Sequence, residues 1–145
     1  MRETIVVGTD GSETAKRAVQ EAVRLAKALQ AELHIVAGFR PMYAKISRAP
    51  AGAAKVWQPL PDSDVDATLQ EAAAAARIAG ATAKTHRMRG DPADVLLNVA
   101  RDVGASTIVV GNRGMRGGRR VLGSVPNSVS HEANCNVLIV QTDRT

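Results

Sequence analysis

The chain has 145 residues, of which 45% are hydrophobic, 23% charged and only 2% aromatic, and its formal net charge is +5. This length and composition predict one folded domain over residues 1–145 and exclude a disordered chain. The positive charge suits an anionic ligand, but the shortage of aromatic stacking platforms and the lack of a DNA- or RNA-binding motif argue against nucleic acid as the partner.

The N-terminal segment MRETIVVGTDGS has one basic residue and an apolar run too short for a signal peptide or a membrane helix, so we expect a cytoplasmic protein without a membrane partner. Residues 4–7 are an apolar, β-branched run that stops at Gly8, which predicts a buried strand. Ser12 is a suitable cap for a helix whose apolar residues recur every three or four positions. These residues are Ala15, Ala18, Val19, Ala22, Val23, Ala26 and Leu29.

The middle of the chain starts with a predicted second strand over residues 33–37, after which the periodicity fails. Residues 38–62 contain four prolines and predict a long loop. A helix is expected from about residue 63 to 78, with Gly80 ending it. Residues 82–88 alternate weakly and predict an edge strand.

The last third begins with Asp91, Pro92 and Asp94, a combination typical of a helix start. Residues 107–110 predict another buried strand, a glycine-rich segment follows, a short helix starts near Ser124, and residues 137–141 form the last strand. Alternating strands and helices predict an α/β fold, a single-domain, Rossmann-like open parallel sheet with helices on both faces.

Two strands of this sheet end in glycine-bearing loops, one starting at Gly8 and the other at Gly111. Open parallel sheets bind ligands beyond the carboxyl ends of their strands, at the point where the strand order reverses. If the two strands are neighbours, both loops open into one crevice. The sequence therefore predicts one ligand site at this edge of the sheet.

The loop from Gly111 to Ser124 has the composition of a phosphate site. Its glycines let the backbone approach an anion, and its arginines add positive charge. The glycines are Gly111, Gly114, Gly117, Gly118 and Gly123, and the arginines are Arg113, Arg116, Arg119 and Arg120. The Ser124 hydroxyl and the first N–H groups of the next helix, including that of Val125, complete the predicted phosphate seat. The alternative is a surface loop with solvated arginines and an ordinary helix cap.

Two familiar nucleotide motifs are absent. Ser124 stands where a Walker loop would carry lysine, and no G-x-G-x-x-G follows the first strand, which argues against a P-loop and a dinucleotide cofactor. Asp10 has three interpretations: it binds ribose hydroxyls, it bridges to phosphates through Mg²⁺, or it caps the first helix. The three histidines have no metal-ligand spacing.

The residues resemble the universal stress protein family over essentially the whole chain. TIVVGTDGSETAKRAV is similar to the family's first strand and helix, and GSVPNSVSHEANCNVLIV to its C-terminal signature. Its ATP-binding members carry G-x2-G-x9-G-[ST]; Gly111, Gly114, Gly123 and Ser124 match, with eight residues in place of nine in the second gap. The composition is most similar to actinobacterial members, some of which bind cyclic AMP.

This resemblance implies a five-stranded parallel sheet in the order 3-2-1-4-5. It implies that Gly8 and Thr9 approach the nucleotide, that Asp10 lies near the ribose or the metal, and that the backbone at Ala37 and Gly38 meets adenine. Many relatives carry a bulkier residue where Gly38 falls, which implies a wider adenine pocket. It also implies a homodimer formed through the last strand, residues 137–140, whose apolar edge would otherwise be exposed.

Four functions follow from this sequence. The first is an ATP-binding regulatory protein of the stress response, with ADP or AMP as related ligands. The second is a slow ATPase, which is less favoured because no residue stands out that would position the attacking water. The third is a cyclic AMP-binding protein, and the fourth a dimeric interaction module without nucleotide binding.

Overall fold

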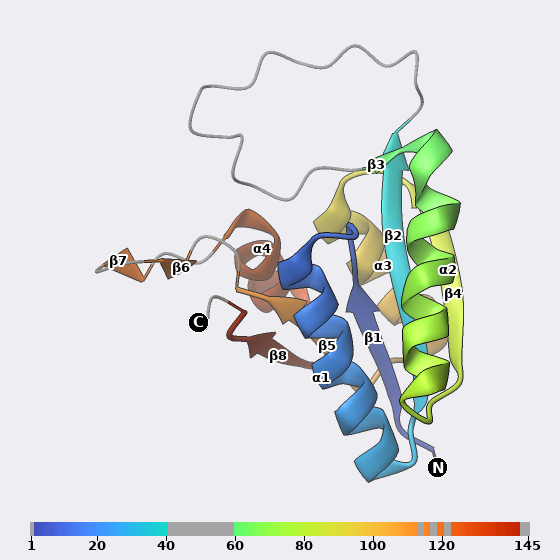
Figure 1. The fold of residues 1–145 in the computed structure, drawn as a ribbon. Coiled ribbons are helices and arrows are strands. Elements are labelled where there is room, and N and C mark those ends of the chain that lie inside the picture. Colours follow the sequence, from blue (N-terminus) through green and yellow to red (C-terminus); the bar gives the residue numbers. More distant parts are fainter. Residues whose placement is uncertain (1, 41–59, 113–114, 117–118, 121–122, 143–145) are drawn as a thin grey trace.

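The computed structural model describes residues 2–40, 60–112, 115–116, 119–120 and 123–142 (Figure 1). The elements are β1 (Thr4–Gly8), α1 (Glu13–Leu29), β2 (Glu32–Arg40), β3 (Leu60–Pro61), α2 (Asp62–Ile78), β4 (Ala83–Arg89), α3 (Pro92–Val103), β5 (Thr107–Gly111), β6 (Met115–Arg116), β7 (Arg119–Arg120), α4 (Ser124–Glu132) and β8 (Asn136–Val140). In these ranges no helix is long and apolar enough to cross a membrane.

The main sheet is parallel and confirms the predicted order. Its five longer strands run β4-β2-β1-β5-β8, which is 3-2-1-4-5 when those five are numbered along the chain. The two-residue strand β3 is an addition that pairs with the end of β2. Strands β6 and β7 form a separate antiparallel ribbon within the glycine-rich segment.

Helices cover both faces of the sheet, as the sequence predicted (Figure 1). One core packs α1 and α2 against the sheet, and a second core packs α3 and α4 against the other face. Ser12 caps α1 as expected, because its Oγ accepts the Ala15 N–H at 3.2 Å. Small and branched side chains fill both cores, which lets the helices approach the sheet closely.

The predicted loop over residues 38–62 is wrong at both ends. Strand β2 continues through Gly38 to Arg40 because β4 runs beside it, with Phe39 paired to Arg89. Residues 60–61 form β3 and α2 begins at Asp62, while residues 41–59 lie outside the described part of the chain. A partner strand distant in sequence satisfies the backbone of residues 38–40, and local periodicity contains no trace of it.

Two local details differ from the sequence pattern. Leu29 continues the apolar period of α1 but is 45% exposed and is the last residue of the helix. Asp91 occupies the N-cap position of α3 as predicted, but its side chain makes no capping hydrogen bond.

Candidate functional site

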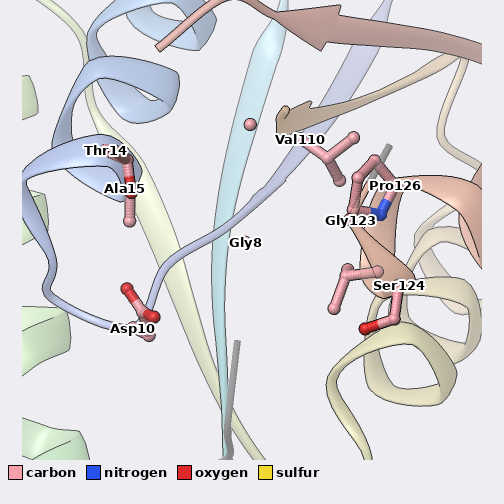
Figure 2. Close-up of a pocket in the computed structure, with 10 residues that line it drawn as sticks. Gly8, Asp10, Thr14, Ala15, Val110, Gly123, Ser124 and Pro126 are labelled. Atoms are coloured by element: carbon pink, nitrogen blue, oxygen red, sulfur yellow. The ribbon is translucent and has the colours of Figure 1, made fainter. Parts of the chain in front are cut away.

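A pocket lies at the carboxyl ends of β1 and β5, where the strand order reverses. The two strands are neighbours, with Val7 paired to Val109, so the loops that follow them open into the same space. Ten residues line it: Gly8, Asp10, Thr14, Ala15, Val110, Gly111, Gly123, Ser124, Val125 and Pro126. Figure 2 shows Asp10, Thr14 and Ala15 facing Gly123 and Ser124 across the pocket.

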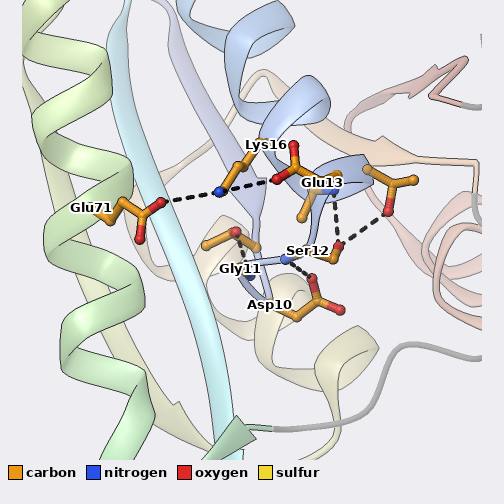
Figure 3. Close-up of polar contacts among 9 residues, drawn as sticks. Asp10, Gly11, Ser12, Glu13, Lys16 and Glu71 are labelled. Carbon is orange, nitrogen blue, oxygen red and sulfur yellow. Dashed lines mark hydrogen bonds and ion pairs between the residues drawn. The ribbon is translucent and has the colours of Figure 1, made fainter.

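The loop between β1 and α1 forms one wall and is held by its own polar groups (Figure 3). The Ser12 N–H donates to Asp10 Oδ1 at 2.9 Å, and the Gly11 N–H donates to Thr9 Oγ1 at 3.1 Å. Gly11 has a φ of +82°, a conformation that side chains disfavour. The Asp10 carboxylate therefore supports the turn before α1 and lines the pocket at the same time.

The N-terminus of α4 forms the opposite wall and differs from that of α1. Gly123 is its N-cap, no side chain makes a capping hydrogen bond, and its first turn contains no acidic residue. Pro126 has no N–H, and the Asn127 N–H donates to the Gly123 carbonyl oxygen at 3.1 Å. The Ser124 and Val125 N–H groups are thus the donors that this helix end offers to a ligand.

The remaining predicted site residues lie elsewhere. Thr9 is buried and its N–H donates to the Val36 carbonyl oxygen at 2.9 Å, so it joins β1 to β2 without lining the pocket. Ala37 and Gly38 are buried in β2 and do not line it either. Arg113 and Gly114 lie outside the described residues.

Gly38 does not widen the space beside it. A Cβ atom at this position would lie 3.2 Å from the Gly90 carbonyl oxygen and 3.7 Å from a Val95 methyl group. The glycine therefore lets β2 pack closely against the start of α3, and the space that a larger side chain would take is already occupied. The missing side chain at Gly38 therefore opens no space among the described residues, and a wider adenine pocket stays a prediction.

Sequence reasoning missed four lining residues: Thr14, Ala15, Val110 and Pro126. Thr14 and Ala15 belong to the first turn of α1, and Pro126 to the first turn of α4. Loops that follow neighbouring strands also bring the first turns of the following helices to the same crevice. The first residues of those helices could therefore have been predicted from the sequence as lining residues.

A second hollow of about 180 Å³ lies between α1 and α2. Alanine and valine make up half of the residues that line it, and Lys16 reaches across to Glu71 with a 3.2 Å ion pair (Figure 3). Neither an open helix start nor a glycine-rich loop borders it. The pocket between Asp10 and Ser124 is therefore the better candidate for an anionic ligand.

Pairing of β2 with β4 also brings together two histidines that the sequence analysis left separate. His34 is 3% exposed; its Nε2 lies 2.7 Å from Glu32 Oε1 and its Nδ1 lies 2.7 Å from His86 Nε2. Burial lowers the pKa of His86, the charges of His34 and Lys84 lower it further, and Asp102 opposes them. The hydrogen bond from His34 and the charge of Lys84 lower the pKa of Glu32. Within the described ranges, no group of three or more His, Cys, Asp or Glu side chains is arranged so that it could hold a metal ion.

We predict that this cluster makes the fold less stable in mild acid. The pKa of His86 is lower in the folded chain than in the unfolded chain, so the unfolded chain takes up the proton first as the pH falls below about 6.5. The contribution of neutral His86 to the free energy of unfolding is fully present above that pH. It is lost as the pH falls through the lower pKa of the folded chain, and the loss is less than about 1 kcal/mol because solvent screens the half-buried ring. Urea unfolding at pH 7 and pH 5.5 should show a smaller decline for His86→Gln than for the wild type. His131→Gln, at an exposed position, should behave as the wild type does; equal declines in all three proteins would refute the assignment.

The comparisons with known proteins agree with the fold. The sequence model of the universal stress protein family matches residues 1–141. Universal stress protein Rv1636 of Mycobacterium tuberculosis is 37% identical over 142 residues, which are 97% of each chain. YxiE of Bacillus subtilis is 36% identical over 153 residues, covering 97% of this chain and 100% of YxiE. The predicted similarity to actinobacterial members is confirmed by the mycobacterial relative.

Two solved structures of relatives are also similar to this chain. The crystal structure of a universal stress protein in complex with cAMP has a TM-score of 0.77 to this chain, 35% sequence identity, and coverage of 98% of both chains. The crystal structure of Rv1636 has a TM-score of 0.59 and 34% identity, covering 97% of this chain and 95% of that one.

Proposed function

The chain belongs to the universal stress protein family, and from that premise we propose that it binds an adenine nucleotide in the pocket between Asp10 and Ser124 and acts as a nucleotide-dependent regulatory protein in the cytoplasm. One observation carries the proposal: the start of α4 is uncapped, free of acidic side chains, and open to the pocket. A helix end of this kind binds phosphate through its N–H groups and its dipole.

In the proposed binding mode, the phosphate contacts the N-terminus of α4 and the nucleoside lies toward the loop between β1 and α1. Gly111 and Gly123, at the two ends of the glycine-rich segment, leave the backbone accessible beside the Ser124 and Val125 N–H groups. In this proposal Arg113 and Gly114 complete the phosphate contacts, and the backbone of Gly8, Thr9, Ala37 and Gly38 lies on the side of the nucleoside.

ATP is the ligand that the family motif favours, and cyclic AMP is the second candidate. The gap between Gly114 and Gly123 is one residue shorter than in the ATP-binding motif, and the 35% identical relative was solved with cAMP. Slow ATP hydrolysis is less favoured, because no described side chain in the pocket other than Asp10 could act as a base for the attacking water.

Isothermal titration with ATP, ADP, AMP, cyclic AMP and adenosine tests the proposal. We expect at least one nucleotide to bind more tightly than adenosine, because the phosphate contributes contacts that the nucleoside lacks. If none of the five ligands binds, or if adenosine binds as tightly as every nucleotide, the proposed function is wrong. The order among the nucleotides decides between ATP and cyclic AMP, and assay of released phosphate tests hydrolysis.

Asp10 is proposed to bind the ribose hydroxyls. It is the only carboxylate among the described residues that line the pocket, so Mg²⁺ would obtain one protein ligand there and would depend on the phosphates for the others. We expect Asp10→Asn, which keeps an oxygen for the Ser12 N–H, to weaken adenosine binding by about tenfold. Binding of 2′,3′-dideoxyadenosine should change little. A loss seen only with ATP in the presence of Mg²⁺ would assign Asp10 to the metal instead.

The exposed edge of β8 is proposed to form a homodimer. Asn136 N–H donates to the Ser106 carbonyl oxygen and Asn112 N–H to the Val140 carbonyl oxygen, so residues 136 and 140 face β5. The backbone groups of Val137 and Ile139 therefore point to the other edge, which no described strand covers. An uncovered apolar edge of this kind favours pairing with a second copy.

We predict that Ile139→Pro produces a monomer, because proline removes an outward N–H and leaves the pairing with β5 intact. Sedimentation equilibrium should show a dimer for the wild type and a dissociation constant raised by more than about tenfold for the variant. Ile139→Ala, which loses the same packing but keeps the N–H, is the matched control and should remain dimeric. Equal dimerisation of the two variants would contradict pairing through this edge.

A further inference from the structure

The start of the glycine-rich loop carries a buried side-chain amide, that of Asn112, for which the proposed function gives no role. Asn112 follows Gly111 directly and is 1% exposed. Its Oδ1 accepts hydrogen bonds from the backbone N–H and the hydroxyl of Thr142, both at 2.8 Å, and its Nδ2 donates to Gln141 Oε1 at 2.8 Å. Because the Thr142 N–H can only donate, the orientation of the Asn112 amide is determined.

This side chain replaces one step of the β5–β8 ladder. The Asn112 N–H donates to the Val140 carbonyl oxygen at 3.0 Å, and in a regular parallel ladder the Thr142 N–H would next donate to the Asn112 carbonyl oxygen. The Thr142 N–H bonds to the side-chain oxygen instead. The Thr142 N–H therefore stays paired although the regular β5–β8 ladder does not continue past Asn112.

Thr142 in turn contacts both α1 and the end of β5. Its carbonyl oxygen accepts a hydrogen bond from Arg17 Nη1 at 3.0 Å, which ties it to α1. Its methyl group packs beside Gly111, where an added Cβ would lie 3.3 Å away. The residues after β8 therefore hold the start of the loop and the helix that carries Thr14 and Ala15, although Thr142 itself does not line the pocket.

We propose that Asn112 is a positioning residue of the phosphate site, and that through it Gln141 and Thr142 set the direction in which the loop leaves β5. This inference rests on the proposed function. It predicts that Asn112 affects binding of the phosphate and leaves binding of the nucleoside unchanged. Asn112 acts on one end of the loop, whereas the start of α4 holds the other end.

Titration of ATP, ADP, AMP, cyclic AMP and adenosine against the full chain separates this role from a general loss of stability. We expect Asn112→Ala to weaken the tightest-bound nucleotide by about tenfold, with adenosine affinity within about twofold of the wild type. Val99→Ala, at a buried position in α3, is the stability control and should leave the nucleotide-to-adenosine ratio unchanged. Thr142→Val removes one hydrogen bond while keeping the side-chain shape, so it should lower the same ratio by a smaller factor.

The outcomes are distinct. If the wild type shows no preference for any of ATP, ADP, AMP and cyclic AMP over adenosine, the proposed function fails and this inference fails with it. If the wild type shows the preference and Asn112→Ala keeps it, the positioning role alone is wrong. If Asn112→Ala does not fold, Thr142→Val decides: an unchanged ratio in that variant overturns the inference, and a lowered ratio supports it.

Discussion

Ser124→Pro should weaken nucleotide binding by about 10- to 100-fold while leaving α4 folded, because it removes a backbone donor that would contact a charged phosphate. Ser124 is the first residue of α4, a position where proline is tolerated and its fixed φ suits the helix. Gly123 before it has φ −63° and ψ 165°, the extended conformation that a residue preceding proline prefers. The substitution therefore changes the ligand contacts with little change to the backbone.

Titration of AMP and cyclic AMP, with circular dichroism to verify the helix content, measures this effect. Ser124→Ala is the matched control, because it removes the hydroxyl and keeps the N–H, and it should cost less than about tenfold in affinity. A larger loss for proline than for alanine would locate the phosphate at the backbone of the helix start. Wild-type affinity in the proline variant would exclude the start of α4 as the phosphate seat.

Leu96→Ala should lower the free energy of unfolding by about 2–5 kcal/mol, the largest stability effect that we predict. Leu96 has no exposed surface and lies in the core that packs α3 and α4 against the sheet. Truncation removes buried methyl groups and leaves a cavity that surrounding strands and helices can only partly close. Because marginal stability is typical of a domain of this size, the variant should unfold at much lower urea concentration.

The control for this prediction is Leu29→Ala. Leu29 continues the apolar periodicity of α1, as Leu96 does that of α3, but it is 45% exposed. Its truncation should therefore change the free energy of unfolding by less than about 0.5 kcal/mol. Urea titrations followed by circular dichroism measure both variants. Similar losses at the two positions would contradict the burial on which the two-core description depends.

Predictions from the sequence were most accurate where interactions between neighbouring residues decide the structure. The capping role of Ser12 and the start of a helix at Ser124 depend on residues within one helical turn, and both were predicted correctly. The prediction of Asp10 beside the start of α4 needed one further assumption, that the first and fourth strands are neighbours. The family resemblance supplied that order, and the register of β1 with β5 confirms it.

The residues that sequence reasoning missed depend on pairing between distant segments. In the sequence, Asn112 is one more polar loop residue, and only the position of β8 brings Thr142 beside it. His34 and His86 are likewise far apart in the sequence, and the pairing of β4 with β2 brings them into contact. The extension of β2 to Arg40 has the same origin. None of these contacts has a local pattern, because each joins residues separated by at least thirty positions in the chain.

The sequence by itself determined the alternation of strands and helices, the glycine-rich loop and the start of a helix near Ser124, because periodicity, capping and backbone freedom act over a few neighbouring residues. Only the tertiary structure decided which residues face the pocket and which support it from behind. Parallel strands bring segments far apart in the chain into register, and that register places Asp10 opposite Ser124 and fastens Asn112 to the residues that follow the last strand.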